Sequence, residues 1–180
     1  MDDRYRAEYD VYRGDSFQLL VRSAPSAAVV AILIRSKLIA CSPKTDQRWD
    51  ARIAIGIGEM TYRGKGPADS DGPAFHLSAD GLADLSKSGD RLIINTPWPA
   101  VDKNLSLLTR FADDRISSWS QYSGETAYHN LLYQESQTDL AKRLHKGQST
   151  ISDRMATAKL DLIRAYIQRV EECIGEGLQS

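Results

Sequence analysis

Segments with strand character are confined to the first 98 residues of this 180-residue chain, and everything after them has the periodicity of helices. Alternating patterns and β-favouring residues mark four stretches: Arg6–Tyr12, Phe17–Ser23, Trp49–Tyr62 and Arg91–Trp98. The proline-flanked stretch TPWPAVD separates the two patterns. This arrangement predicts an α+β protein, with an α+β domain at 1–100 and an all-α domain at 101–180.

The front half has an internal order of its own. The turn RGDS, which contains Asp15, joins the first two strands as a β-hairpin. The apolar run Ala27–Ala40 is long enough for a largely buried helix, and another helix precedes the fourth strand. Gly56 and Gly58 weaken the third strand, which indicates a bulge or the close approach of another element, in the simplest case a helix.

Composition excludes several classes of protein. A formal net charge of −1 argues against a chain coated with basic residues, and no apolar run approaches the 18 residues of a membrane span. No signal peptide is apparent, so we expect a cytoplasmic protein. Cys41 and Cys173 are expected to be reduced thiols, buried or half-buried. His76, His129 and His145 do not cluster with other metal ligands, so no zinc site is expected.

The last helix carries an apolar stripe. The stripe residues share one helix face and are Leu160, Ile163, Ile167, Val170 and Ile174. Such a stripe either forms the interface of a homodimer or belongs to the core of a small helical domain.

The stretch TDLAKRLHKGQSTISDRMATAKL, from Thr138 to Leu160, has the pattern of a helix-turn-helix. Four apolar residues would lock the two short helices together: Leu140, Leu144, Ile151 and Met155. Ala141 is the small residue at the crossing, and HKG forms the turn. The second helix is expected to begin at Gly147 or Gln148. His145 stands where glycine commonly adopts a left-handed conformation, at a cost of roughly 1 kcal/mol.

This motif predicts contact with double-stranded DNA. Polar residues in the first turns of the second helix are placed to reach base edges and phosphates, and flanking basic residues to touch the backbone. The candidate DNA-binding residues are Lys142, Arg143, Lys146, Gln148, Ser149, Thr150, Ser152, Asp153 and Arg154. Lys146 replaces a common apolar residue, and Asp153 is unfavourable near phosphates. The alternative is a helical hairpin that only packs or dimerises. Because a single motif of this size binds weakly, we expect a homodimer.

Several motifs in a fixed order carry a resemblance to a known family. They are YRGDSFQL, RIAIGIGE followed by DGPAF, NTPW, and LAKRLHKGQSTIS. Together they resemble the SatD-like family of bacterial proteins, over about Val11 to Leu160. The resemblance implies a nucleotide-cyclase-like palm domain, with a ferredoxin-like antiparallel sheet and helices on one face, followed by a helix-turn-helix. It also implies a bacterial transcriptional regulator whose palm serves as sensor or scaffold.

In such palm domains the acid of the hairpin turn, here Asp15, is one of two carboxylates that hold Mg²⁺ for a nucleotide. The strand that carries the partner carboxylate, and the first helix, have no counterpart in this sequence. That strand would lie in the middle of the sheet, so its absence exposes two strand edges. The native start lies upstream, or the hairpin pairs directly with a neighbouring strand, or a second subunit fills the gap.

Catalysis by the palm is not favoured. Cyclases carry an Asn/Arg pair after the corresponding strand, and His76 and Asp80 stand near those positions without replacing it. The loop RGKG at 63–66 is a weak signal for a phosphate cradle. Three functions therefore stay open: a DNA-binding regulator, a Mg²⁺-dependent nucleotide-binding or cyclase-like enzyme that uses Asp15, and an oligomerising interaction module.

Overall fold

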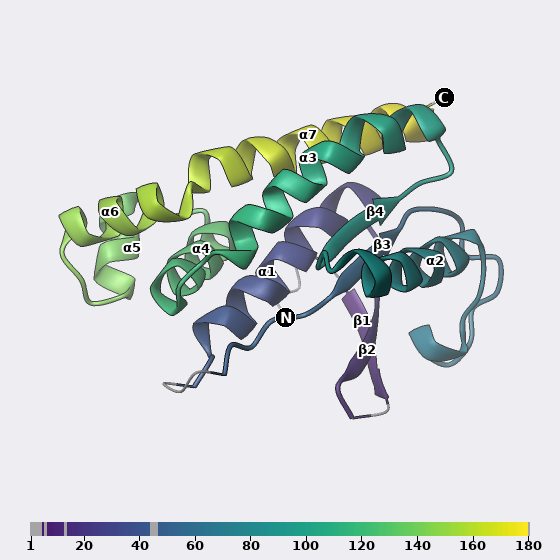
Figure 1. Cartoon of the computed structure of the whole chain (residues 1–180), viewed down its shortest axis with the longest axis horizontal. Coiled ribbons are helices and arrows are strands. Elements are labelled where there is room, and N and C mark those ends of the chain that lie inside the picture. Colours follow the sequence, from purple (N-terminus) through teal and green to yellow (C-terminus); the bar gives the residue numbers. More distant parts are fainter. Residues whose placement is uncertain (1–4, 6, 13, 44–46, 180) are drawn as a thin grey trace.

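The computed structural model describes residues 5, 7–12, 14–43 and 47–179. The strands are β1 (Ala7–Tyr12), β2 (Ser16–Val21), β3 (Ile53–Gly56) and β4 (Leu92–Asn95). The α-helices are α1 (Ala27–Ala40), α2 (Pro73–Ser88), α3 (Pro99–Ser117), α4 (Gln121–Tyr133), α5 (Gln137–Arg143), α6 (Gln148–Ala158) and α7 (Leu160–Gln179). Short 3-10 helices lie at η1 (Ala24–Ser26) and η2 (Pro67–Asp69). The mixed α+β class expected from the sequence is confirmed (Figure 1).

The strands form two separate pairs. β1 and β2 are antiparallel, with Ala7 opposite Val21, whereas β3 and β4 are parallel, with Ile53 opposite Leu92. The prediction of one antiparallel sheet is therefore wrong for these residues. β3 and β4 are joined by α2, and a helical crossover returns the chain in the same direction, which makes the pair parallel. Nor does the hairpin pair with β3 or β4.

Helices cover both faces of the β3–β4 pair, although they were expected on one face only. On one face α2 approaches so closely that a Cβ atom at Gly56 would lie 2.0 Å from the carbonyl oxygen of Ala74. The opposite face carries Ile55, Leu92 and Ile94, which join the hydrophobic core. The predicted close approach of a helix to the glycine-rich strand is thus confirmed. Alternation of side chains along each strand separates the two faces.

Helix α1 has no continuous polar face and is buried over most of its surface, with Lys37 as its one exposed residue. Its main neighbour is α4, which belongs to the far half of the sequence (Figure 1). The two helices meet at Gly124, where a Cβ atom would lie 2.9 Å from the carbonyl oxygen of Ser36. A helix without a polar face needs neighbours all round, and α4 supplies one of them.

The apolar stripe of α7 lies in this same core. Its five residues are all buried, at exposed fractions of 7% or less. The alternative in which the stripe forms a dimer interface is therefore wrong. One continuous core cluster includes residues of α1, β3, α3, α4 and α7, and Trp119 closes it by donating from Nε1 to the carbonyl oxygen of Ala158 at 2.9 Å. The proposed division at residue 100 stays a prediction.

A buried ion-pair cluster ties α1 to α3 and to the segment before β3. Arg35 is fully buried and binds Asp50 through two bonds of 2.9 Å, from Nε and Nη2. Its Nη1 donates to Asp113 at 2.6 Å. Asp113 also accepts from the backbone N–H of Arg91 at 2.6 Å, at the start of β4. One side chain thus fixes three segments that are distant in the sequence.

The two cysteines differ. Cys173 is buried in the core, as expected, and Cys41 at the end of α1 is exposed, which corrects the prediction for that residue. Cys41 is the first residue after α1, two positions beyond Ile39, which is still in the core. Within the described residues, no helix combines the length and the apolar composition that a membrane crossing requires.

Candidate nucleic-acid interface

Helices α5 and α6 lie at one end of the molecule, opposite α2 (Figure 1). Helix α5 begins with a capping serine, because the Ser136 hydroxyl accepts the N–H of Asp139 at 3.2 Å and donates to its carboxylate at 2.7 Å. These contacts, together with Lys142, lower the pKa of the Asp139 carboxyl. The sequence therefore starts this helix with a local and self-contained signal.

The turn between α5 and α6 follows a defined hydrogen-bond pattern. Lys146 donates its N–H to the carbonyl of Ala141 at 3.0 Å, and His145 donates to that of Lys142 at 3.2 Å. This pair of bonds is the Schellman arrangement of a helix end. It places His145 in the left-handed region with a φ of 51°, as the sequence predicted. A residue with a side chain therefore carries a conformation that favours glycine.

The contacts predicted between the two short helices are present. Leu140 and Ile151 are completely buried against each other's helices, with Ala141 at 6% exposure beside them. Leu144 and Met155 pack against this small cluster, and Met155 also touches the main core. These contacts fix the angle of α6 relative to α5.

Helix α6 packs against α4 through Arg154. Arg154 pairs with Glu125 at 3.0 Å and lies over the ring of Tyr122, 4.5 Å from its centroid. Only 14% of the Arg154 side chain is exposed. Arg154 thus faces α4, apart from the other candidate residues.

The remaining candidates share an exposed surface on α5, the turn and the start of α6. They are Lys142, Arg143, Lys146, Gln148, Ser149, Thr150, Ser152 and Asp153. Gly147 caps the amino end of α6, which begins at Gln148 as predicted. The first turn of α6 thus presents free backbone N–H groups and small polar side chains to solvent, which is an arrangement that favours phosphate.

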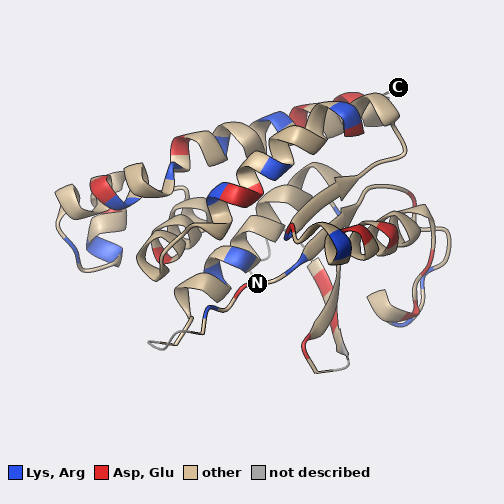
Figure 2. Ribbon diagram, viewed as in Figure 1, with Lys and Arg blue, Asp and Glu red and all other residues tan. Residues whose placement is uncertain are grey.

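Acidic neighbours reduce the positive charge of this surface. Arg143 forms an ion pair with Glu135 and covers the ring of Tyr133 at 3.7 Å, and Lys142 pairs with Asp139 at 3.3 Å. Within the described residues Lys146 has no such partner. Figure 2 shows basic and acidic residues interspersed at this end of the molecule. The surface is therefore mixed in charge.

The front half offers no assembled metal or phosphate site among the residues described. Asp15 is exposed at the tip of the hairpin, beside Gly14 with its φ of 82°, and no cluster of three or more His, Cys, Asp or Glu side chains suited to a metal ion occurs in the described ranges. His76 lies 3.2 Å from Asp71, both exposed. Asp80 is exposed on α2. The structure brings none of these residues together with Asp15.

The glycine-rich loop at 63–66 is engaged by acids of β1. Arg63 pairs with Glu8 at 2.8 Å, and a Cβ atom at Gly66 would lie 2.5 Å from the Asp10 carboxylate. Asp10 also accepts the N–H of Ala68 at 2.9 Å. Carboxylates of the protein itself thus occupy the position that a phosphate cradle would need.

Sequence reasoning missed the Arg35 cluster. Its signal was a single arginine inside the apolar run AILIRSKL, since an arginine is almost never fully buried without a partner. No protein-family model, curated protein or solved structure matches this chain.

Proposed function

We propose that the chain is a DNA-binding protein in which α5 and α6 form a helix-turn-helix and α6 enters the major groove. The observation that carries the proposal is the exposed first turn of α6, held at a fixed angle by Leu140 and Ile151. Gln148 suits adenine, and Ser149, Thr150 and Ser152 suit phosphates or either base. Lys142, Arg143 and Lys146 then flank the groove.

The resemblance to the SatD-like family supports a role as a bacterial transcriptional regulator. The front half would be a degenerate, nucleotide-cyclase-like palm domain that serves as sensor or scaffold. A homodimer remains our expectation, because one short helix pair gives weak binding. Its interface must lie outside the α7 stripe, which is buried in the core.

The test is binding to duplex DNA by fluorescence anisotropy across a salt series. With three phosphate-contacting cations per copy, the logarithm of the affinity should fall with the logarithm of salt at a slope of about −3 for each copy that binds, and about −5 for a dimer. Lys146→Ala should reduce this slope by about 1. Lys103→Ala, at an exposed position on α3, is the matched control and should leave the slope unchanged.

A separate experiment tests whether α6 discriminates among DNA sequences. The double variant Gln148→Ala with Ser152→Ala should lose preference among DNA sequences, by about 1–3 kcal/mol, while it keeps binding to random DNA. Absence of salt-dependent binding at low salt would refute the proposal. The helix pair would then be a packing device, and light scattering would test the oligomerising alternative.

A further inference from the structure

Helix α3 carries three large apolar side chains on its solvent side. Leu107 is 59% exposed, Leu108 is 41% exposed and Phe111 is 67% exposed. Residues four apart on a helix lie about 40° apart around its axis, so Leu107 and Phe111 are neighbours on the surface, with Leu108 beside them. The opposite side of α3 packs into the core through Leu105 and Ile116, and α7 lies along it (Figure 1). The three exposed residues form the apolar patch of α3.

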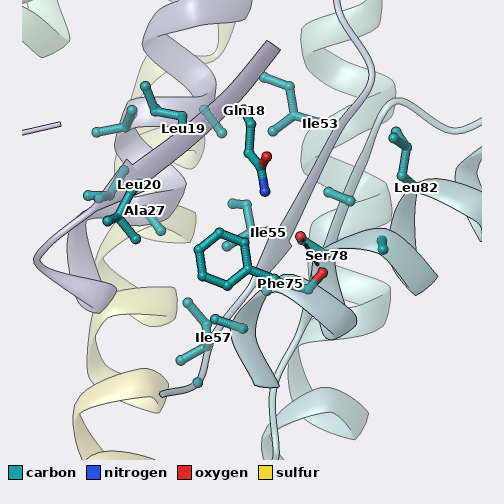
Figure 3. Close-up of a pocket in the computed structure, with 18 of the residues that line it drawn as sticks. Gln18, Leu19, Leu20, Ala27, Ile53, Ile55, Ile57, Phe75, Ser78 and Leu82 are labelled. Atoms are coloured by element: carbon teal, nitrogen blue, oxygen red, sulfur yellow. Dashed lines mark hydrogen bonds between the residues drawn. The ribbon is translucent and has the colours of Figure 1, made fainter. Parts of the chain in front are cut away.

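The groove between β2 and β3 is separate from this patch. It has a volume of about 310 Å³ and is lined by residues such as Leu19, Ile55 and Phe75 (Figure 3). Its walls come mainly from β2, α1, β3 and α2, and among the described residues none that lines it belongs to α3. A molecule bound in the groove would therefore not by itself cover the apolar patch of α3.

Polar and charged residues border the patch on both flanks. Lys103 and Asp114 lie on one flank, and both are exposed. Asn104 and Arg115 lie on the other flank and are exposed as well. Within the described parts of the chain, the side chains of Lys103, Asp114 and Arg115 have no hydrogen-bond or ion-pair partner. An apolar centre with an unpaired polar rim is the composition of a protein–protein interface.

The order of these residues favours a second copy of α3 as the occupant. In a twofold contact between antiparallel helices, each flank meets the same flank of the other copy in reverse order. A helix can therefore pair with itself only if its charges are complementary in reverse. When Leu107 of each copy lies opposite Phe111 of the other, Lys103 on the first flank lies at the level of the other copy's Asp114. By symmetry this opposite-charge pair occurs twice.

The remaining residues of the face fit the same register. On the second flank Asn104 lies opposite Arg115, whose guanidinium can donate to the amide oxygen. Leu108, nearer the twofold axis, lies close to its own counterpart. Arg110, near the axis on the first flank, is already paired with Asp90 of its own chain at 3.5 Å. A segment of unrelated sequence would not require such a self-complementary order, whereas a second copy does.

We propose that two copies of the chain form a dimer through the apolar patches of α3, with the helices antiparallel about a twofold axis. The contact would supply the interface of the homodimer that the proposed function expects, and its biological role rests on that function. One helix face per copy is a small interface, so we expect a dissociation constant in the micromolar range.

The experiment is sedimentation velocity on the whole chain without DNA, over about 1 to 300 μM protein. The unmodified chain should pass from monomer to dimer as its concentration rises. Leu107→Glu should raise the dissociation constant by about 100-fold or more, because the substitution occurs twice in a symmetric interface. Leu82→Glu, at 46% exposure on α2 in the lining of the groove, is the matched control and should leave the dimer unchanged.

Charge reversal distinguishes a second copy from any other occupant. Lys103→Glu and Asp114→Lys each create two like-charge pairs, so each should weaken its own dimer by about tenfold or more. An equimolar mixture of the two variants should recover the original affinity to within about threefold, because every opposing pair again carries opposite charges. Simple loss of one charge, as in Lys103→Ala, should weaken the dimer by less than about fivefold.

Three results would overturn the proposal. They are a monomer at every concentration, a dimer that Leu107→Glu leaves intact, and a mixture of the charge-reversed variants that stays monomeric. A monomer that still binds DNA with the expected salt dependence would refute this interface and leave the proposed function standing. A dimer with the expected response to the variants that binds no DNA would support the interface and refute the function.

Discussion

Removal of the buried arginine should be the most damaging single substitution in the front half. In Arg35→Met the side chain keeps an apolar stem but becomes shorter and loses the guanidinium. Four hydrogen bonds disappear, two to Asp50, one to Asp113 and one to Ser117. Asp50, whose side chain is 2% exposed, then keeps the backbone N–H of Ala51 at 2.8 Å and the more distant guanidinium groups of Arg91 at 3.7 Å and Arg48 at 4.0 Å.

The expected loss of unfolding free energy is about 3–5 kcal/mol, the usual result of breaking a buried pair from one side. Burial alone lowers the pKa of Arg35, but its contacts with Asp50 and Asp113 raise that pKa above its ordinary value, so the pair stabilises the charged form. We place the loss nearer 3 kcal/mol, because Asp113 keeps bonds to the N–H groups of Arg91 and Leu92.

The assay is equilibrium unfolding in urea, with the midpoint and the m-value fitted together. Arg22→Met is the matched control, since Arg22 forms an exposed pair with Glu8 at 3.1 Å and should change the midpoint little. In the double variant Arg35→Met with Asp50→Asn, part of the loss should be recovered, because one unpaired buried charge is gone. A loss below about 1 kcal/mol for Arg35→Met, with an unchanged m-value, would refute this account of the cluster.

Three further predictions concern single residues. His145→Gly should raise the stability by about 0.5–1 kcal/mol by relieving its φ of 51°, and an unchanged melting temperature would show that the turn carries no strain. Burial raises the pKa of Tyr166 from 10.0 to about 12, so the contribution of its neutral hydroxyl to stability is complete below pH 10 and should fall by about 2 kcal/mol as the pH rises to 12. Tyr166→Phe should remove this pH dependence in urea titrations at each pH. Gly124→Ala should cost about 1–3 kcal/mol in thermal unfolding, because its methyl would collide with the backbone of α1, and a neutral result would contradict the close packing of α1 and α4.

Local signals in the sequence predicted the helices well. The apolar run Ala27–Ala40 has the bounds of α1, and α6 begins at Gln148 as expected. These boundaries depend on residues within a turn or two of each helix end, so they can be read without knowledge of the fold. The left-handed conformation at His145 was likewise predicted from the residues of the turn itself.

Local patterns of this kind did not predict how the strands pair. The stretch Trp49–Tyr62 has strand character throughout, but only Ile53–Gly56 forms a strand, because it has β4 alone as a partner. Whether β3 and β4 run parallel depends on the path of α2 between them. The partners of Arg35 lie 15 and 78 residues away, which no local pattern indicates.

In the candidate nucleic-acid interface, too, features set by local sequence were predicted and features set by distant residues were not. Exposure of the first turn of α6 follows from the spacing of Leu140 and Ile151, so the sequence predicted it. The inward position of Arg154 depends on Glu125 and Tyr122 of α4, and the neutralisation of Arg143 depends on Glu135. The sequence therefore predicted the shape of the surface better than its charge.

The packing of α1 against α4 also has a consequence for the order of synthesis. Helix α1 leaves the ribosome early, without a polar face, while the helix that covers it begins only at Gln121. Until then the face of α1 that packs against α4 has no native cover, so the nascent front half cannot reach its final packing as it emerges. We expect the chain to complete its core only after α7 is made, and to depend on holding chaperones during translation.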